Sequence, residues 1–363
     1  MNICFRVDSS TKIGTGHVMR CLTLAEELKK NGHSVYFICR LHDGHLCNLV
    51  LHKGFTVFKL NQLNHPVMNN DISNQSKHAS WLGVSQKQDL QETTTILKSS
   101  QIKFDWIIID HYAVDSTWEK EIRNHIPKIM VIDDLADREH DCDILLDQNY
   151  YLNATTRYTN LIPSTCILLL GPEYALLRDE FIDLRKIPRI QKSQNAILVS
   201  YGGSDPTNET LKAINAIKMI NPTNLTIHIV TGPSNPNIDI IKKHCDENNF
   251  IFHFNIDYMA KLMYEVDFAI CAGGSITWER YCLGTPAILT AIAYNQKELC
   301  ENVIQLGIDH YLGISELVTE QTIKDVLMSF LEEIDRSHLS EKAKKIVDGN
   351  GKSKVMNTIA TIK

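Results

Sequence analysis

The sequence predicts an α/β protein of two doubly wound domains, each built on a parallel sheet, that face a central cleft. Strand and helix patterns alternate along residues 3–133 and again along residues 195–306, which is typical of parallel sheets covered by helices. A glycine-rich turn follows the first predicted strand of each half. The 363 residues are enough for two domains that each bury a core. Open parallel sheets bind ligands at the carboxyl ends of their strands, so we expect both glycine-rich turns to line the cleft.

In the first half, short apolar runs bounded by turn residues predict the strands, and apolar side chains at helical spacing predict the helices. The predicted strands are 3–7, 34–39, 55–60, 106–110 and 129–133. The predicted helices are 17–31, 45–53, 86–99 and 115–125. A polar stretch near residues 61–85 interrupts the alternation, and it is either a loop at the cleft or an insertion without function.

The second half repeats the alternation without a repeat of the sequence itself. The predicted strands are 196–200, 225–230, 250–254, 268–271 and 287–291. The predicted helices are 208–220, 237–248, 258–265, 275–283 and 295–306, followed by 322–334 and 340–361. The last of these is interrupted by the turn residues Gly349-Asn350-Gly351.

These patterns predict the domain boundaries. We expect an N-terminal α/β domain over residues 1–178 and a C-terminal α/β domain over residues 195–334. Residues 179–194, which are rich in basic side chains and include Pro188, are typical of a linker. The helices within residues 335–363 could cross back to the first domain.

Composition and charge exclude several classes of protein. The formal net charge is -6, with no long run of one sign, so no electropositive surface for nucleic acid is expected. The ten cysteines include no Cys-x-x-Cys pair, which indicates reduced thiols and no structural zinc site. Arg6 and Asp8 interrupt the first apolar run, and nowhere do about 18 apolar residues follow one another, so neither a signal peptide nor a membrane span is predicted. We therefore expect a cytoplasmic protein; the sequence leaves its oligomeric state open.

The segment Gly14-Thr15-Gly16-His17 joins the first predicted strand to the first predicted helix. Glycines let a ligand approach the backbone closely, and a helix N-terminus favours developing negative charge, so His17 is a candidate proton acceptor. A Gly-x-Gly turn also begins the dinucleotide-binding fingerprint. The third glycine of that fingerprint is absent, however, and the second strand is followed by Arg40 rather than an acidic residue.

In the second half, two further turns could hold a diphosphate: Gly202-Gly203-Ser204, and Gly273-Gly274-Ser275, whose serine is expected to cap the next helix. Glu279 lies about one turn into that helix, where it could accept the ribose hydroxyls or simply favour the helix dipole. The glycine turns could equally be ordinary links between a strand and a helix.

Other polar clusters have both a functional and a structural interpretation. Asp110-His111-Tyr112 ends a central strand and could contact the substrate or orient His17. Tyr174 and Arg178 could reach a sugar or anchor the linker. The groups around His42-Asp43-Gly44-His45 and Asp133-Asp134 contain residue types that bind metals, but no ligand geometry follows from their spacing, so no metal site is predicted.

Several motifs, taken together and in order, resemble a known family. They are Arg6-Val7-Asp8-Ser9, Gly14-Thr15-Gly16-His17, Ile109-Asp110-His111-Tyr112, Gly171 to Arg178, Tyr201 to Asp205, Ala272 to Ser275 with Glu279, and Asn295-Gln296. This set resembles the UDP-sugar hydrolases of pseudaminic acid biosynthesis, which are GT-B-fold relatives of the MurG-type glycosyltransferases. The resemblance covers roughly residues 1 to 310, and the tail beyond that is longer than in the shortest family members. Trp278, before the glutamate, stands at a position that differs among relatives.

The resemblance implies a reaction and a set of site residues. The reaction is hydrolysis of UDP-2,4-diacetamido-2,4,6-trideoxy-β-L-altropyranose to UDP and the free sugar, by inverting attack of water at the anomeric carbon, without cofactor or metal. His17 is implied as the base, and the implied substrate contacts are Gly14, Asp8, His111, Tyr174, Arg178 and Asn295. The implied UDP contacts are Gly202, Gly203, Gly273, Gly274, Ser275 and Glu279. The implied end use is flagellin glycosylation or surface polysaccharide. The alternative is a GT-B glycosyltransferase that passes a UDP-linked amino sugar to an acceptor.

Overall fold

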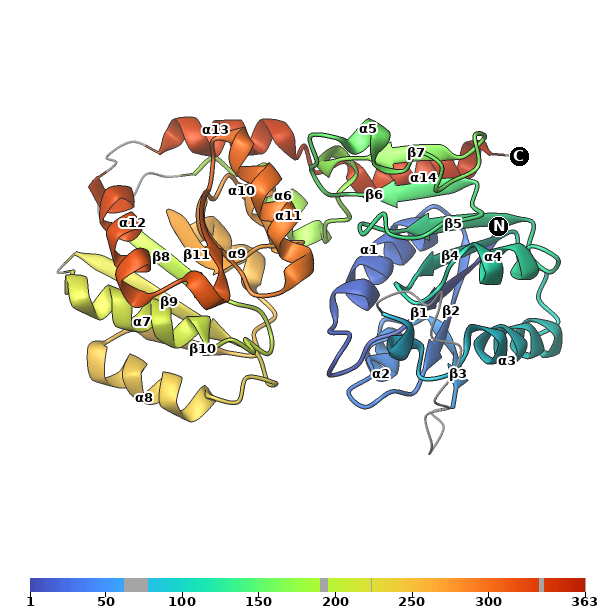
Figure 1. Cartoon of the computed structure of the whole chain (residues 1–363), viewed down its shortest axis with the longest axis horizontal. Coiled ribbons are helices and arrows are strands. Elements are labelled where there is room, and N and C mark those ends of the chain that lie inside the picture. Colours follow the sequence, from blue (N-terminus) through green and yellow to red (C-terminus); the bar gives the residue numbers. More distant parts are fainter. Residues whose placement is uncertain (62–77, 190–194, 223, 333–335, 363) are drawn as a thin grey trace. The chain divides into compact units, whose positions relative to one another are not determined.

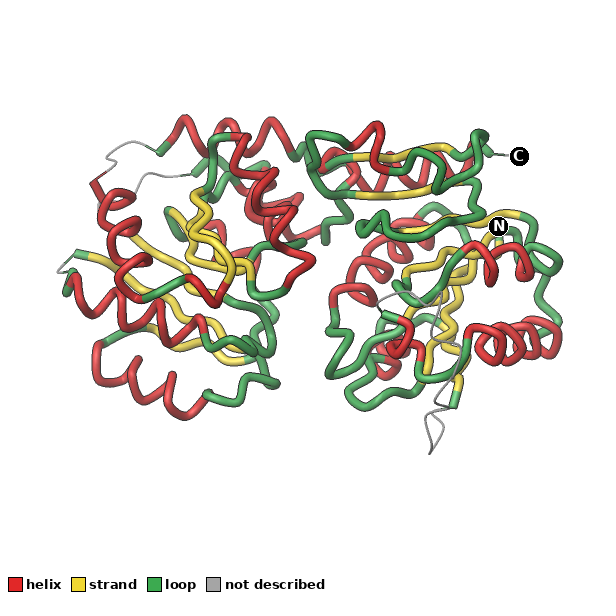
Figure 2. The backbone as a smooth tube through the Cα atoms, viewed as in Figure 1, coloured by secondary structure: helices red, strands yellow, loops and turns green. Residues whose placement is uncertain are grey.

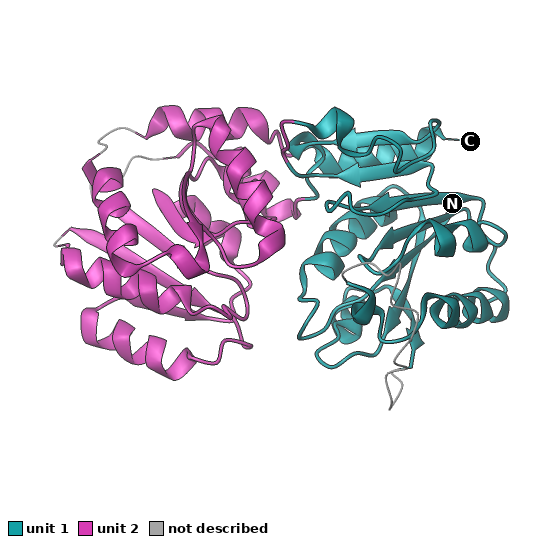
Figure 3. Ribbon diagram, in the orientation of Figure 1, with its two compact units in different colours: residues 1–149, 153–176, 350–363 teal, residues 150–152, 177–349 magenta. Residues whose placement is uncertain are grey.

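The structure is a computed structural model that describes residues 1–61, 78–189, 195–222, 224–332 and 336–362 (Figures 1 and 2). It divides into two compact units (Figure 3). Unit 1 comprises Met1–Asn149, Asn153–Leu176 and Asn350–Lys363, and unit 2 comprises Tyr150–Leu152 and Leu177–Gly349. Each unit contains a parallel sheet flanked by helices, so the predicted fold class of two parallel-sheet α/β domains is confirmed.

Unit 1 contains, in the described residues, a seven-stranded parallel sheet with the order β3-β2-β1-β4-β5-β6-β7. The strands are β1 (Asn2–Val7), β2 (Ser34–Arg40), β3 (Thr56–Leu60), β4 (Trp106–Asp110), β5 (Lys128–Ile132), β6 (Ile144–Asp147) and β7 (Ile167–Leu170). The helices are α1 (Gly16–Lys30), α2 (Cys47–His52), α3 (Gln86–Ser99), α4 (Ser116–Ile122), α5 (Ala154–Arg157) and α14 (Gly351–Thr361), with short 3-10 helices η1 (Ala79–Leu82) and η2 (Pro172–Tyr174).

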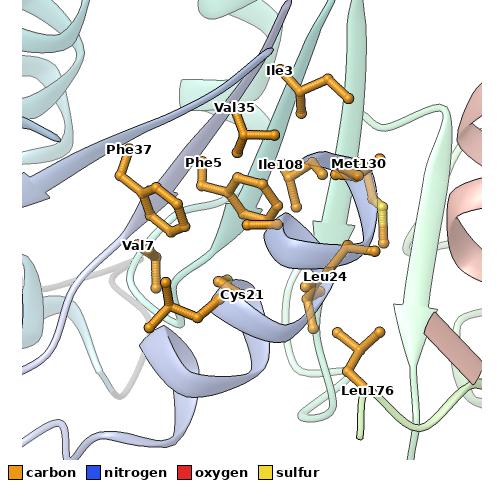
Figure 4. Packing of buried hydrophobic residues seen from close by; sticks show 14 of the residues in the cluster. Ile3, Phe5, Val7, Cys21, Leu24, Val35, Phe37, Ile108, Met130 and Leu176 are labelled. Atoms are coloured by element: carbon orange, nitrogen blue, oxygen red, sulfur yellow. The ribbon is translucent and has the colours of Figure 1, made fainter. Parts of the chain in front are cut away.

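Alternate side chains of the central strands supply two cores, one on each face of this sheet. On β1, Ile3, Phe5 and Val7 join the core formed with α1 and α14, and Phe5 stacks on Phe37 of β2 with 5.0 Å between the ring centroids (Figure 4). Cys4, the intervening residue, belongs to the second core, beneath α3 and α4. Both faces of the sheet are therefore buried, which explains the nearly continuous apolar runs of its strands.

Unit 2 contains, within the part of the chain that the structure describes, a six-stranded parallel sheet with the order β10-β9-β8-β11-β12-β13. The strands are β8 (Asn195–Ser200), β9 (Leu225–Thr231), β10 (Ile251–Phe254), β11 (Phe268–Ala272), β12 (Ala287–Ala291) and β13 (His310–Ile314). The helices are α6 (Asp179–Arg185), α7 (Glu209–Ile220), α8 (Ile238–Asn248), α9 (Met259–Glu265), α10 (Ile276–Leu283), α11 (Tyr294–Val303), α12 (Glu320–Glu332) and α13 (Ser337–Ile346), with 3-10 helices η3 (Ile304–Leu306) and η4 (Ser315–Leu317).

The structure adds elements that the sequence patterns did not predict. Strands β6, β7 and β13 each have only four or five residues. Residues 179–185 of the predicted linker form helix α6, which packs against α9 and α10 of unit 2. The end of the predicted linker and most of the polar stretch near 61–85 lie outside the described residues. Of the last two helices, α13 packs on α10 in unit 2, whereas α14 packs on α1 in unit 1.

Each sheet reverses the direction of its strand order at one place. In unit 1 the chain builds outward from β1 to β3 on one side and from β4 to β7 on the other, so the reversal lies between β1 and β4. In unit 2 it lies between β8 and β11. The connections that follow the two strands at such a reversal run to opposite faces of the sheet, and they leave a crevice at the carboxyl ends of the strands. His17 and both predicted diphosphate turns follow strands that flank these reversals.

Candidate active site

His17 is the second residue of helix α1, and it follows the turn that leaves strand β1. Gly14 has a φ of +82°, a conformation that favours glycine, and Gly14, Thr15 and Gly16 are exposed beside the nearly buried imidazole. Thr15, at the N-cap position, makes no side-chain cap hydrogen bond. Backbone that a ligand can approach therefore lies next to the histidine.

Asp110 holds the imidazole of His17. It is the last residue of β4, the strand paired with β1, and its Oδ1 lies 2.6 Å from His17 Nδ1. A proton on Nδ1 is donated to the carboxylate in this arrangement, which leaves the lone pair of Nε2 as the proton acceptor. Asp110 is fully buried, yet its pKa lies below the ordinary value: burial raises it, but the charges of Arg20 and His17 outweigh that effect.

Arg20, one helical turn after His17, clamps the same carboxylate. Its Nε donates to Asp110 Oδ2 at 2.6 Å and its Nη2 donates to Asp110 Oδ1 at 2.7 Å. Nη2 also lies 3.3 Å from His17 Nδ1, and Nη1 donates to Asp134 Oδ2 at 3.2 Å. Sequence reasoning missed Arg20; the signal was its spacing of three residues from His17, which puts both side chains on one face of a helix.

Aromatic rings gather beside His17. The ring of Tyr112 meets the imidazole edge to face with 4.6 Å between centroids, and its hydroxyl donates to Asp134. Trp81, on η1, lies 6.3 Å from His17 and 5.6 Å from Tyr112, and His78 packs against Trp81 at 4.4 Å. Trp81 was not predicted as a site residue because it falls in the polar stretch near 61–85. These rings give the base an apolar surrounding on one side.

Asp8 and His111, two predicted substrate contacts, lie in a buried polar network at the ends of β1 and β4. Asp8 is fully buried; it accepts hydrogen bonds from Arg6 Nη1 at 2.6 Å and from the backbone N–H of Arg40 at 2.7 Å. The other carboxylate oxygen of Asp8, Oδ2, lies 3.3 Å from His111 Nε2 and 3.5 Å from His42 Nε2. Burial lowers the pKa of His111, although Asp8 acts in the opposite direction. Both residues lie next to the His17 pair but face the interior.

In unit 2, the two glycine turns follow neighbouring strands, β8 and β11. Gly202 and Gly203 are exposed. Gly273 is buried over helix α11, where a Cβ atom would lie 2.2 Å from Cys300 Sγ, so this position requires glycine. Gly274 has a φ of +131°. The turns therefore present bare backbone at the carboxyl end of the sheet, where helix N-termini favour anions.

Helix α10 begins after the second glycine turn. Ser275 occupies its N-cap position, but, contrary to expectation, its exposed side chain makes no cap hydrogen bond there, since its φ of -57° and ψ of -27° are already helical. On α11, Gln296 Oε1 accepts a hydrogen bond from the backbone N–H of Ile292 at 3.0 Å, and its Cβ lies 3.7 Å from the position of a Cβ on Gly273. The serine hydroxyl is thus directed to solvent rather than to its own helix.

Glu279, on the first turns of α10, faces Arg178 of the same unit. Arg178 Nη2 donates to Glu279 Oε1 at 3.3 Å, while Arg178 Nη1 pairs with Glu180 at 2.7 Å. A quarter of the Glu279 side chain is exposed. Burial nevertheless raises the pKa of Glu279, and Arg178 offsets this only in part. A carboxylate that is short of hydrogen-bond donors can gain stability from ligand hydroxyls.

The remaining predicted contacts divide between the units. Asn295 is exposed on the first turn of α11 in unit 2. It precedes Gln296, which packs near Gly273. Tyr174 ends η2 in unit 1, where it packs on the core, and its ring centroid lies 5.8 Å from Lys354 Nζ. Among the described residues, no group of three or more His, Cys, Asp or Glu side chains is arranged to hold a metal ion, and no helix is both long and apolar enough to span a membrane.

Known proteins resemble the chain in sequence and in structure, although no family model matches it. It is 32% identical over 299 residues to the UDP-2,4-diacetamido-2,4,6-trideoxy-beta-L-altropyranose hydrolase of Campylobacter jejuni subsp. jejuni serotype O:2, covering 81% of this chain and 92% of that protein. It is 22% identical to the spore coat polysaccharide biosynthesis protein SpsG of Bacillus subtilis, covering 97% and 95% of the two chains. The crystal structure of Acinetobacter baumannii MurG matches with a TM-score of 0.66 at 12% identity, covering 99% of each chain. The last likeness concerns the fold, and it confirms the GT-B-like prediction.

The close packing of Gly273 on Cys300 can be tested by stability measurements. We expect Gly273→Ala to lower the free energy of unfolding of unit 2 by about 1–3 kcal/mol, because the new methyl group overlaps the sulfur. Cys300→Ala in the same chain removes that sulfur and should recover part of the loss. Urea unfolding measures both, with Gly203→Ala, where a Cβ meets nothing within 4 Å, as the control. Strict additivity of the two changes would contradict the contact.

Proposed function

The chain belongs to the family of the UDP-2,4-diacetamido-2,4,6-trideoxy-β-L-altropyranose hydrolase, and on this premise we propose that it hydrolyses that UDP-sugar to UDP and the free 2,4-diacetamido-2,4,6-trideoxy sugar. The observation that carries the proposal is the hydrogen bond between His17 and Asp110 at the strand reversal of unit 1. It leaves one imidazole nitrogen free of the carboxylate and able to take a proton from water.

The proposal divides the chemistry between the units. In unit 1, His17 Nε2 takes a proton from water as the water oxygen attacks the anomeric carbon. The bond between that carbon and the diphosphate oxygen breaks, and UDP leaves with the electron pair. Attack from the side opposite the leaving group inverts the anomeric centre. Asp110 stabilises the imidazolium that forms, as a carboxylate does in other base pairs of this type.

Unit 2 is proposed to hold UDP. The turns at Gly202-Gly203 and Gly273-Gly274 and the exposed hydroxyl of Ser275 offer polar groups to the diphosphate, where helix N-termini favour negative charge. Glu279 is proposed to accept the ribose hydroxyls, and Asn295 to contact the sugar. Backbone N–H groups can stabilise the departing diphosphate, so no metal ion or other cofactor enters the proposal.

The proposed substrate contacts also include residues that touch the substrate and residues that act from the interior. They are Gly14, Asp8, His111, Tyr174 and Arg178. Gly14 is exposed beside His17 and suits a direct contact. Asp8 and His111 are buried, so we propose that they support the base from within. Arg178 is proposed to neutralise Glu279 until the ribose binds. Tyr174 has no observation beyond its motif to support a contact.

Cellular role and location rest on family membership alone. We propose that the reaction takes place in the cytoplasm within pseudaminic acid biosynthesis, and that its product serves flagellin glycosylation or a surface polysaccharide. The alternative reaction is transfer of the amino sugar to an acceptor hydroxyl, since hydrolases and glycosyltransferases share this fold. The two reactions differ in whether UDP is released when no acceptor is present.

Release of UDP without an acceptor tests the reaction and its base together. With the UDP-sugar, buffer and EDTA alone, we expect steady release of UDP, and His17→Asn should lower turnover by at least about 10²-fold because it removes the proton acceptor. UDP affinity, measured by calorimetry, should stay nearly unchanged. The control is His125→Asn, an exposed histidine of unit 1.

No UDP without an acceptor would favour the glycosyltransferase alternative. Turnover of His17→Asn within a few-fold of the wild type would remove His17 as the base, and activity that returns only with Mg²⁺ or Mn²⁺ would contradict the absence of a metal.

We expect the Glu279 carboxylate to strengthen UDP binding and to lower the stability of the folded protein. We expect Glu279→Gln to weaken UDP binding by roughly 1–3 kcal/mol, because the amide replaces a charged acceptor of the ribose hydroxyls. Burial raises the pKa of Glu279 in the folded protein, so the wild type loses stability as the pH rises from about 4.5 through that raised pKa. The glutamine variant lacks this loss. Calorimetry and urea unfolding at several pH values measure the two effects, with the exposed Glu301→Gln as control. Unchanged UDP affinity would contradict the assignment.

A further inference from the structure

We propose that Arg20 is a positioning residue for His17: it holds the carboxylate of Asp110, and its positive charge opposes the tendency of that carboxylate to favour the imidazolium. This inference rests on the proposed function for its catalytic meaning, but the charge balance itself can be measured without any reaction. Arg20 contacts His17 and the two carboxylates of Asp110 and Asp134.

The distances place a negative and a positive charge close to the same imidazole nitrogen. His17 Nδ1 lies 2.6 Å from a carboxylate oxygen of Asp110 and 3.3 Å from a guanidinium nitrogen of Arg20. Charge interactions fall with distance in the same way for both signs, so the two act on the imidazole with similar strength and opposite sign. Asp110 alone would favour the imidazolium, which can accept no further proton. Arg20 opposes that bias and leaves the hydrogen bond that fixes the tautomer.

The other groups around the imidazole do not replace Arg20. They are Asp134 after β5, Tyr112 after β4 and Cys21 on α1, while His78 before η1 packs on the ring of Tyr112. Burial raises the pKa values of Tyr112 and Cys21, so both are neutral near pH 7. Asp134 adds a second negative charge, to which Arg20 is also bound at 3.2 Å. Arg157 donates to the backbone carbonyl of Asp134 at 3.1 Å. The loss of Arg20 would therefore remove the guanidinium that binds the Asp110 carboxylate beside His17.

The geometry favours Arg20 over a lysine for this task. Two of its nitrogens bind the two oxygens of Asp110 at 2.6 and 2.7 Å, which fixes the plane of the carboxylate. That plane sets the direction of the oxygen that accepts the proton of His17 Nδ1. Arg20 therefore acts twice on the base, through the position of Asp110 and through its own charge, and a set of variants can separate the two effects.

The acid limb of the pH profile of kcat/KM is the first readout, since it reports the protonation of the base in the free enzyme. In Arg20→Gln the limb should move to higher pH by about one unit or more, because the carboxylates then favour the imidazolium. In Asp110→Asn it should move the opposite way. The double variant should return towards the wild-type position. Arg20→Lys, which keeps the charge but not the paired contact, should lower kcat with little shift of the limb.

A purely structural role for Arg20 would lower kcat in every variant and leave the limb in place, and that result would overturn the proposal. Arg123→Gln is the matched control: this arginine is also held by two carboxylates, Asp141 and Asp143, but near the amino ends of β5 and β6, away from His17. Its pH profile should match the wild type.

NMR titration of ¹⁵N-labelled histidine is the second readout, with the His17 signal assigned by its loss in His17→Asn. The midpoint of that signal should be higher in Arg20→Gln than in the wild type by about one unit. An unchanged midpoint contradicts the charge balance, whether or not the protein hydrolyses anything. A shifted midpoint in a protein without hydrolase activity would uphold the charge balance and remove the proposed function instead.

Discussion

The hydrogen bond between His17 and Asp110 is the interaction on which the proposed chemistry of unit 1 depends. It joins the helix after β1 to the end of β4, so it forms only because these strands are neighbours in the sheet. The chain leaves the two strands towards opposite sides of the strand order, which opens a crevice at their carboxyl ends. Topology thus brings together two residues that are 93 positions apart in the sequence.

Beneath this pair, buried charges hold the strand ends in place. Arg6 and Arg40 are fully buried, and both donate to Asp89 on α3, while Arg6 also donates to Asp8. Isolated charges would be costly in the interior, but each of these has partners of opposite sign. The loss of one member would leave the others unpaired, so the network is expected to tolerate substitution poorly. It joins the ends of β1 and β2 to helix α3.

Strong periodic patterns made most of the fold predictable, and short or irregular segments did not. The apolar runs of β2, β4 and β11 stand out in the sequence, and the four-residue β10 was also predicted. Strands β6 and β7, of four residues each, follow polar segments that hide them. Helix α6 lies in the predicted linker because it is short and is flanked by Arg178, Lys186 and Pro188, which are typical of a connecting segment. In the site, motifs indicated His17 and the segment containing Asp110. Arg20 resembles any basic residue on a helix surface until the fold brings Asp110 to it, and no local pattern reveals such a distant partner.

The central claim is that water attacks carbon with the aid of the His17–Asp110 pair, and hydrolysis in ¹⁸O-labelled water tests it most directly. UDP is the decisive product, because the anomeric oxygen of a free sugar can exchange with water. We expect UDP without label by mass spectrometry, together with a first-formed sugar of inverted anomeric configuration by NMR. Label in the terminal phosphate of UDP would mean attack at phosphorus and would contradict the account.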